Sequence, residues 1–173
     1  MTPPPSGKKP LVGISQCLLG DAVRYDGKSR GNIIVIEQLS KIFQLLAVCP
    51  EVEAGLPVPR PAVQLTGSLK NPQLTGVTEP SLNITTRMQQ YCRKKTAELA
   101  CLHGFIFKSR SPSCGLHSTT VFIDGKPVTD TGDGVFAASL CRQYPQLAVI
   151  EDTELTNKTR LNAFINKLQQ KDY

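Results

Sequence analysis

The sequence predicts an α/β fold with a mainly parallel sheet. Short apolar runs alternate with amphipathic segments along most of the chain, a pattern that is typical of strands and helices following each other in turn. The first run is apolar throughout, as expected of a strand buried on both faces of a parallel sheet. The length of 173 residues suits one domain. We therefore predict a single three-layer, Rossmann-like domain over residues 11–173, with a small hairpin, and a flexible tail over residues 1–10.

The first elements are two strands and the helix between them. Residues 11–15 form the first apolar run, and a long polar connection follows at residues 16–31. Connections of this length in a compact domain are often functional. Residues 32–44 return apolar side chains every three or four positions, which predicts a helix with Asn32 as its N-cap. The second strand is expected at residues 45–48.

The middle of the chain contains a stiff loop and a long helix. Residues 57–61 hold three prolines, which exclude a central strand or helix but keep a loop rigid. Two short extended pieces are expected at residues 63–65 and 73–75. A helix is then predicted near residues 81–103, because its apolar side chains fall on one stripe. The apolar run at residues 104–107 predicts another buried strand.

The last third of the chain begins with a hairpin. Residues 119–128 predict two strands that turn at an Asp-Gly pair. A short helix is expected from residue 135, followed by a strand at residues 146–150. We expect Asp152 or Thr153 to cap the final helix.

Composition limits the class of protein. Hydrophobic residues make up 40% of the chain and charged residues 20%, which is typical of a globular rather than a disordered protein. No apolar run approaches the roughly 18 residues that cross a membrane, and the start of the chain lacks the pattern of a signal peptide. We therefore expect a cytoplasmic protein whose six cysteines are kept as thiols for ligation or catalysis. The net charge of +6 favours anionic ligands.

Three cysteines lie in loops that follow predicted strands. Cys17 and Cys49 come just after the first two strands, and Cys114 lies in the hydroxyl-rich turn after residues 104–107. Ligands of open α/β sheets gather at the carboxyl ends of the strands, so we expect these thiols to meet there. A shared metal or catalytic site is one interpretation, and a buried thiol acting as a small hydrophobe is the other. We prefer the second for the cysteines of the apolar helical stripes: Cys92, Cys101 and Cys141.

The types of residue around these thiols indicate the chemistry that they support. The large separations in sequence exclude a local zinc knuckle, whereas soft thiolates favour an iron–sulfur cluster, zinc or copper(I). Three thiolates on a [4Fe–4S] cluster would leave one iron open to a substrate atom, above all sulfur. Glu51 follows Cys49 closely and is a candidate for proton exchange, with a solvated surface carboxylate as the alternative. Ser111 and Ser113 either donate hydrogen bonds to the site or close the turn.

At these motifs the chain resembles the DUF523 family, whose characterised members are the thiouracil desulfurases. The resemblance spans about residues 11–150. The stretches that carry it are residues 17–20, 24–27, 49–51, 55–60, 111–115 and 131–135.

The resemblance implies a [4Fe–4S] cluster as cofactor, held by the metal ligands Cys17, Cys49 and Cys114. It also implies that the enzyme removes sulfur from a thiolated pyrimidine such as 2-thiouracil, leaving the oxo base and sulfide. Glu51 and Ser111 would be the catalytic residues that assist proton transfer and orientation. The partner would be a small thiolated base or nucleotide.

Several points stay open at this level. Residues 28–30 form a basic trio that would favour an anionic substrate such as a thiolated nucleotide, although a solvated loop is the simpler interpretation. Ser113 is expected to shape the turn. A non-catalytic module that binds zinc or an iron–sulfur cluster, attached to RNA through its basic surface, is the main alternative function. Sulfur transfer through a cysteine persulfide is a third. No membrane partner and no firm nucleic-acid partner is expected.

Overall fold

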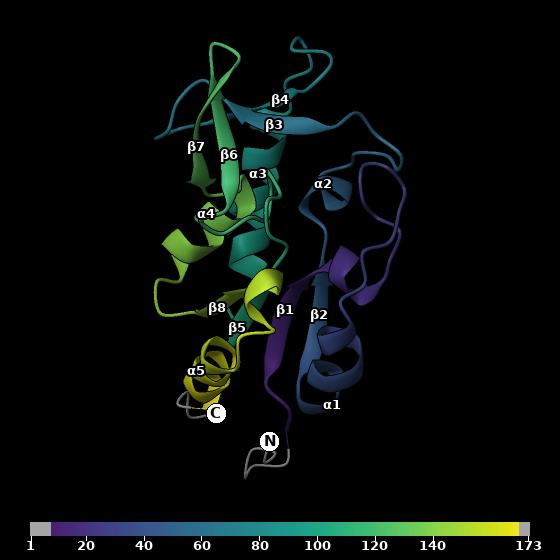
Figure 1. The fold of residues 1–173 in the computed structure, drawn as a ribbon, viewed down its shortest axis with the longest axis vertical. Helices are drawn as coiled ribbons and strands as arrows, with labels where there is room; N and C mark the ends of the chain where they lie inside the picture. The colour runs from purple at the N-terminus through teal and green to yellow at the C-terminus, as the bar shows by residue number, and fades with distance from the viewer. Residues whose placement is uncertain (1–7, 170–173) are drawn as a thin grey trace.

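The structure, a computed structural model, describes residues 8–169 and confirms the predicted α/β fold (Figure 1). Four parallel strands form sheet A in the order β2-β1-β5-β8. These strands are β1 (Leu11–Ser15), β2 (Gln44–Val48), β5 (Gly104–Phe107) and β8 (Ala148–Glu151). The predicted tail lies outside the described residues as far as residue 7, and the predicted domain does so from residue 170. Pro10 is buried, and its carbonyl accepts the N–H of Gln44 at 2.9 Å.

The order of the strands in sheet A determines where a ligand can bind. The chain runs from β1 to β2 on one side and returns past β1 to β5 and β8 on the other. Such a reversal separates the loops that follow neighbouring strands and opens a crevice at the carboxyl edge of the sheet. The loops after all four strands of sheet A meet at this edge.

Helices cover both faces of sheet A and complete the three layers (Figure 1). One face packs against the segment formed by η2 (Val35–Leu39) and α1 (Ser40–Ile42), and against α5 (Lys158–Gln169). The other face packs against α3 (Thr85–Glu98) and α4 (Val135–Gln143). Within residues 8–169, no helix combines the length and the apolar character needed to cross a bilayer.

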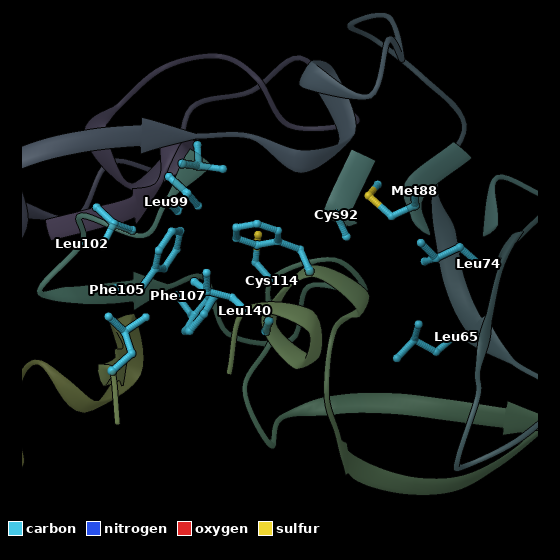
Figure 2. Close-up of a cluster of buried hydrophobic side chains, with 14 of the residues drawn as sticks. Leu65, Leu74, Met88, Cys92, Leu99, Leu102, Phe105, Phe107, Cys114 and Leu140 are labelled. Atoms are coloured by element: carbon cyan, nitrogen blue, oxygen red, sulfur yellow. The ribbon is translucent and has the colours of Figure 1, made fainter. Parts of the chain in front are cut away.

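Each face of sheet A has its own hydrophobic core because side chains alternate along the strands. On β5, Phe105 and Phe107 belong to the core beneath α3 and α4, whereas Ile106 belongs to the opposite core. The ring of Phe136 on α4 meets Phe105 edge-on, with ring centroids 5.5 Å apart. Gly13 in β1 makes room for this packing, since a Cβ there would lie 2.4 Å from the Phe105 ring. The core beneath α3 and α4 is the larger of the two, and Figure 2 shows it.

A second sheet, B, lies at the other end of the molecule (Figure 1). Its order is β4-β3-β6-β7, with β3 (Val63–Thr66), β4 (Gln73–Gly76), β6 (Thr119–Ile123) and β7 (Lys126–Gly132). The two predicted extended pieces are confirmed as the antiparallel pair β3–β4, and the predicted hairpin as β6–β7. The parallel pairing of β3 with β6 joins them into one sheet. The sequence predicted the two antiparallel pairs of sheet B but not the parallel β3–β6 pairing that joins them.

The first helical segment has the predicted N-cap, but some of the side chains predicted to face inward are exposed. The side-chain oxygen of Asn32 accepts two backbone N–H groups of the first turn, at 3.0 and 3.4 Å. A π-helical turn then adds a residue, so that Val35 and Leu39 are buried. Ile33 and Ile36, which the predicted stripe placed inward, are 62% and 43% exposed. Leu39 and Phe43, which belong to the same predicted stripe, are buried, so the regular 3.6-residue period failed only for Ile33 and Ile36.

The predicted cap of the final helix is also wrong. Asp152 belongs to a separate short turn, η3 (Asp152–Glu154), directly after β8. The side chain of Asn157 caps α5 instead, because its oxygen accepts the N–H groups of Thr159 and Arg160 at 3.1 and 3.2 Å. This division leaves the Asp152 carboxylate available at the carboxyl edge of sheet A.

The aromatic contacts of Phe136 yield a test of the larger core. Phe136→Ala should lower the free energy of unfolding by about 3–5 kcal/mol, the usual cost of removing a buried phenyl ring. Urea denaturation measures this loss. Val128→Ala on β7, where the side chain is 47% exposed, should change the same quantity by about 0.5 kcal/mol or less. Equal losses in the two variants would contradict this description of the core.

Candidate functional site

A cavity of about 740 Å³ opens at the carboxyl edge of sheet A. The segments that follow all four strands contribute to its wall. Five side chains singled out from the sequence line it together: Cys17, Cys49, Glu51, Ser111 and Cys114. The fold therefore brings together residues that are up to 97 positions apart in the chain.

The three thiols enter the cavity from three different loops. Cys17 lies in the short turn η1 (Gln16–Leu19), directly after β1. Cys49 directly follows β2 and is the N-cap of α2 (Pro50–Glu53). Cys114 is in the loop after β5 and is also part of the larger core, where Figure 2 shows its sulfur among aromatic and aliphatic side chains. Negative charge on either of the other two thiols would disfavour the thiolate of Cys114.

Burial keeps these thiols protonated in the absence of a cation. It raises the pKa of Cys17 to about 11 and also raises the pKa of Cys49. The pKa of Cys114 is raised well above its usual value, mainly by burial, although a hydrogen bond with the Ser15 hydroxyl opposes this effect. Metal coordination deprotonates thiols. The arrangement is therefore suited to a positively charged centre that converts all three thiols into thiolates.

The spatial arrangement of the thiols bears on the kind of centre that they fit. In the part of the chain that the structure describes, no group of three or more His, Cys, Asp or Glu side chains is arranged to hold a single metal ion. A mononuclear zinc site needs its sulfurs within about 2.3 Å of the metal. Cys17, Cys49 and Cys114 are three soft sulfur donors around one cavity, and thiolates are the donors that hold iron–sulfur clusters.

Glu51 is fixed in the cavity wall by two side chains. Its Oε2 accepts a hydrogen bond from Arg60 Nε at 2.7 Å, and its Oε1 accepts one from Ser113 Oγ at 2.8 Å. The side chains of Glu51 and Arg60 are only 12% and 5% exposed. Arg60 also donates to the carbonyl of Val23 at 3.0 Å. Glu51 is thus an ion-paired, largely buried carboxylate rather than a solvated surface charge.

The two serines of the Cys114 loop make contacts that differ from the expected ones. Ser111 Oγ accepts the N–H groups of Ser113 and Cys114, at 3.3 and 3.0 Å, and thereby closes the turn. The hydroxyl of Ser113 instead points to the carboxylate of Glu51. The O–H of Ser111 is not used in the turn, and the residue lines the cavity. Both serines therefore contribute to the site: Ser111 closes the turn that carries Cys114, and Ser113 binds the carboxylate of Glu51.

The loop that carries Cys114 is held from two sides. Two backbone N–H groups at the start of α4 donate to the carbonyl of Ser113, at 2.9 and 3.2 Å. Gly134 permits this close approach, since a Cβ there would lie 2.5 Å from the carbonyl carbon of Ser113. On the other side, the carboxylate of Glu151 accepts the N–H of Leu116 at 2.7 Å. The position of Cys114 thus depends on α4 and on the end of β8.

Sequence reasoning assigned no role in the site to three other side chains of the cavity wall. Arg60 was visible only as part of a proline-rich stretch that carries the family resemblance, Lys108 only as a polar residue that follows a strand, and Asp152 only as a candidate helix cap. In the structure, Lys108 Nζ lies 2.9 Å from Asp152 Oδ2. The signal that would have found this pair is its position, because both residues directly follow neighbouring parallel strands.

The other three cysteines do not line the cavity. Cys92 is buried in the larger core, as predicted, and Cys141 is partly buried against the same core. Cys101 is exposed, so the prediction of a core position is wrong for it. The reason is the length of α3, which ends at Glu98 rather than continuing to residue 103.

The model of the family described as 2-thiouracil desulfurase matches residues 12–152. The solved structure of the [4Fe–4S]-dependent thiouracil desulfidase TudS, a DUF523 protein, is 27% identical to the chain, with a TM-score of 0.68. This similarity covers 90% of the chain and 99% of TudS. No curated protein matches the chain.

The pair Arg60–Glu51 yields a prediction about stability. Arg60→Met should lower the free energy of unfolding by about 3 kcal/mol, because it leaves a largely buried carboxylate without its cation. Adding Glu51→Gln to this variant should restore part of the loss. Urea denaturation of the single and double variants measures the coupling. Arg87→Met on the exposed side of α3 is the control, and a loss no larger than that of the control would contradict the buried pair.

Proposed function

As a member of the 2-thiouracil desulfurase family, the chain is a desulfurase, and we propose that it acts on a thiolated pyrimidine such as 2-thiouracil. The reaction replaces the thiocarbonyl sulfur by the oxygen of water and yields the oxo base and hydrogen sulfide. The oxidation state of the carbon does not change, so no electron carrier is consumed. The observation that carries this proposal is the meeting of three thiols and the fixed carboxylate of Glu51 in one cavity.

Cys17, Cys49 and Cys114 are the proposed ligands of a [4Fe–4S] cluster, the cofactor named for the similar structure of TudS. Support comes from the donor set, which consists of three soft sulfur atoms from three loops around one cavity. When bound, the cluster would supply a Lewis-acidic iron that has no protein ligand and can accept the sulfur of the substrate.

Glu51 is the proposed proton carrier. Water must lose protons as its oxygen joins the ring carbon, and the departing sulfur must gain them. An ionised carboxylate has about four acceptor sites, of which Arg60 and Ser113 occupy two. The remaining sites can take a proton from water and return it. Arg60 and Ser113 hold the carboxylate in one orientation, which such transfers require.

Ser111 is the proposed orienting group for the substrate. Its oxygen is fixed by the N–H groups of Ser113 and Cys114, so the direction of its O–H is restricted. The hydroxyl therefore offers a donor beside Cys114 that can hold the ring of the base. Arg24, which is paired with Asp26, also lines the cavity together with Arg30 and Arg110, and this positive charge admits a thiolated nucleotide as well as the free base.

The same geometry disfavours sulfur transfer through a cysteine persulfide. A nucleophilic cysteine must be available as the thiolate. Burial raises the pKa of each of the three thiols in the cavity, so without a metal they are poor nucleophiles.

The assignment of Cys114 is tested by its replacement. After anaerobic reconstitution, Cys114→Ser should bind far less iron and labile sulfide than the parent protein and should release no sulfide from 2-thiouracil. Cys101→Ser, which changes an exposed cysteine outside the cavity, should match the parent in both assays. A Cys114→Ser protein that lacks the cluster but desulfurates at the parent rate would refute the proposal.

Replacement of Glu51 separates chemistry from cofactor binding. Glu51→Gln keeps the shape of the side chain and one acceptor oxygen, so it should retain the iron content of the parent. The rate of sulfide release should fall by about 100-fold or more, the usual effect of losing a proton-transfer group. Steady-state kinetics with 2-thiouracil measure this fall. Glu98→Gln on α3, where the carboxylate is 51% exposed, is the matched control. Near-parent turnover in Glu51→Gln would remove Glu51 from the mechanism.

A further inference from the structure

Lys108 and Asp152 form an ion pair in the cavity wall that the proposed function does not use. Lys108 directly follows β5 and Asp152 directly follows β8, so the pair bridges the ends of two neighbouring strands. Their Nζ and Oδ2 atoms lie 2.9 Å apart, and the side chains are 24% and 13% exposed. An ion pair shielded to this degree is weakly screened by water and salt.

The contacts of Lys108 make it a fixed charge rather than a proton donor. An ammonium group has three N–H donors. In the structure, Lys108 Nζ donates to Asp152 Oδ2 and to the hydroxyl and the carbonyl of Ser109, at 2.9, 3.1 and 3.3 Å. The second oxygen of Asp152 accepts the N–H of Ser109 at 2.8 Å. All three donors of the ammonium group are engaged, so the charge is held in one place.

The pair is also tied to the strand that leads to Cys17. The N–H of Lys108 donates to Ser15 Oγ at 3.0 Å, and Ser15 is the last residue of β1. Lys108 and Asp152 line the same cavity as Cys17. A cofactor held by that thiol therefore lies near two fixed charges of opposite sign.

We propose that Lys108 and Asp152 are positioning residues whose fixed, opposite charges set the reduction potential of the cluster at its Cys17 corner. This inference rests on the proposed function, because it requires the cluster to be bound at the three thiols. Net charge near an iron–sulfur cluster is one of the main factors that set its potential. A cation nearby stabilises the reduced form, which carries one more negative charge, and an anion destabilises it.

The test compares two variants that break the same ion pair and change the local charge in opposite directions. In spectroelectrochemical titrations of the anaerobically reconstituted protein, Lys108→Met should shift the potential to a more negative value. Asp152→Asn should shift it to a more positive value. Arg160→Met removes a cation from an ion pair outside the cavity, at 2.6 Å from Glu154, and should leave the potential unchanged.

The outcomes separate an electrostatic from a merely structural role. Loss of the contact alone affects both variants in the same way, so shifts of the same sign, or no shift, overturn the inference. Lys108→Arg keeps the cation and should keep the parent potential. If Lys108→Met fails to hold the cluster, Asp152→Asn decides, and a potential that is not more positive overturns the inference.

The parent protein provides the reference for the proposed function. Iron, labile sulfide and sulfide release from 2-thiouracil are measured in it first. If the parent binds no cluster, the proposed function and the present inference both fail. If the parent is loaded and active but the potentials of the two variants do not separate, only the role of Lys108 and Asp152 is lost.

Discussion

The carboxylate of Glu51 connects the three loops on which the site is built. Glu51 itself belongs to the short helix that begins after Cys49. Through Arg60 it is tied to the carbonyl of Val23, in the loop that follows the Cys17 turn, and through Ser113 to the loop of Cys114. A single buried anion therefore fixes the relative positions of segments that share no secondary structure. The carboxylate that we propose as proton carrier therefore also links the loops that line the cavity.

The surroundings of the thiols show why this site needs both burial and nearby cations. Burial alone disfavours thiolates and places Cys114 within the larger core. Lys108 and Arg24 counter part of this effect at Cys17, the most exposed of the three thiols. A positively charged centre supplies the further positive charge that the thiolates need, because coordination stabilises all three of them. The cavity thus offers three sulfur donors that a positively charged cofactor would stabilise as thiolates.

The sequence indicated the carboxyl edge of the sheet more reliably than the roles within it. Cys17 and Cys49 could be placed because buried parallel strands are visible as apolar runs, and the ends of such strands meet. The contacts of Ser111 and Ser113 could not be read in advance, because they depend on how the turn folds against Glu51. Asp152 was expected to cap a helix, but Asn157 has that role. The phase of the first helical segment changed because a π-helical turn leaves no mark in the apolar pattern.

The central claim is that three thiols from three loops hold one iron–sulfur cluster at the edge of sheet A. Its most direct test is the metal and labile sulfide content of the parent protein, prepared and analysed without oxygen. The account predicts about four iron and four labile sulfide per chain, the content of one [4Fe–4S] cluster. One zinc per chain, with neither iron nor labile sulfide, would contradict it.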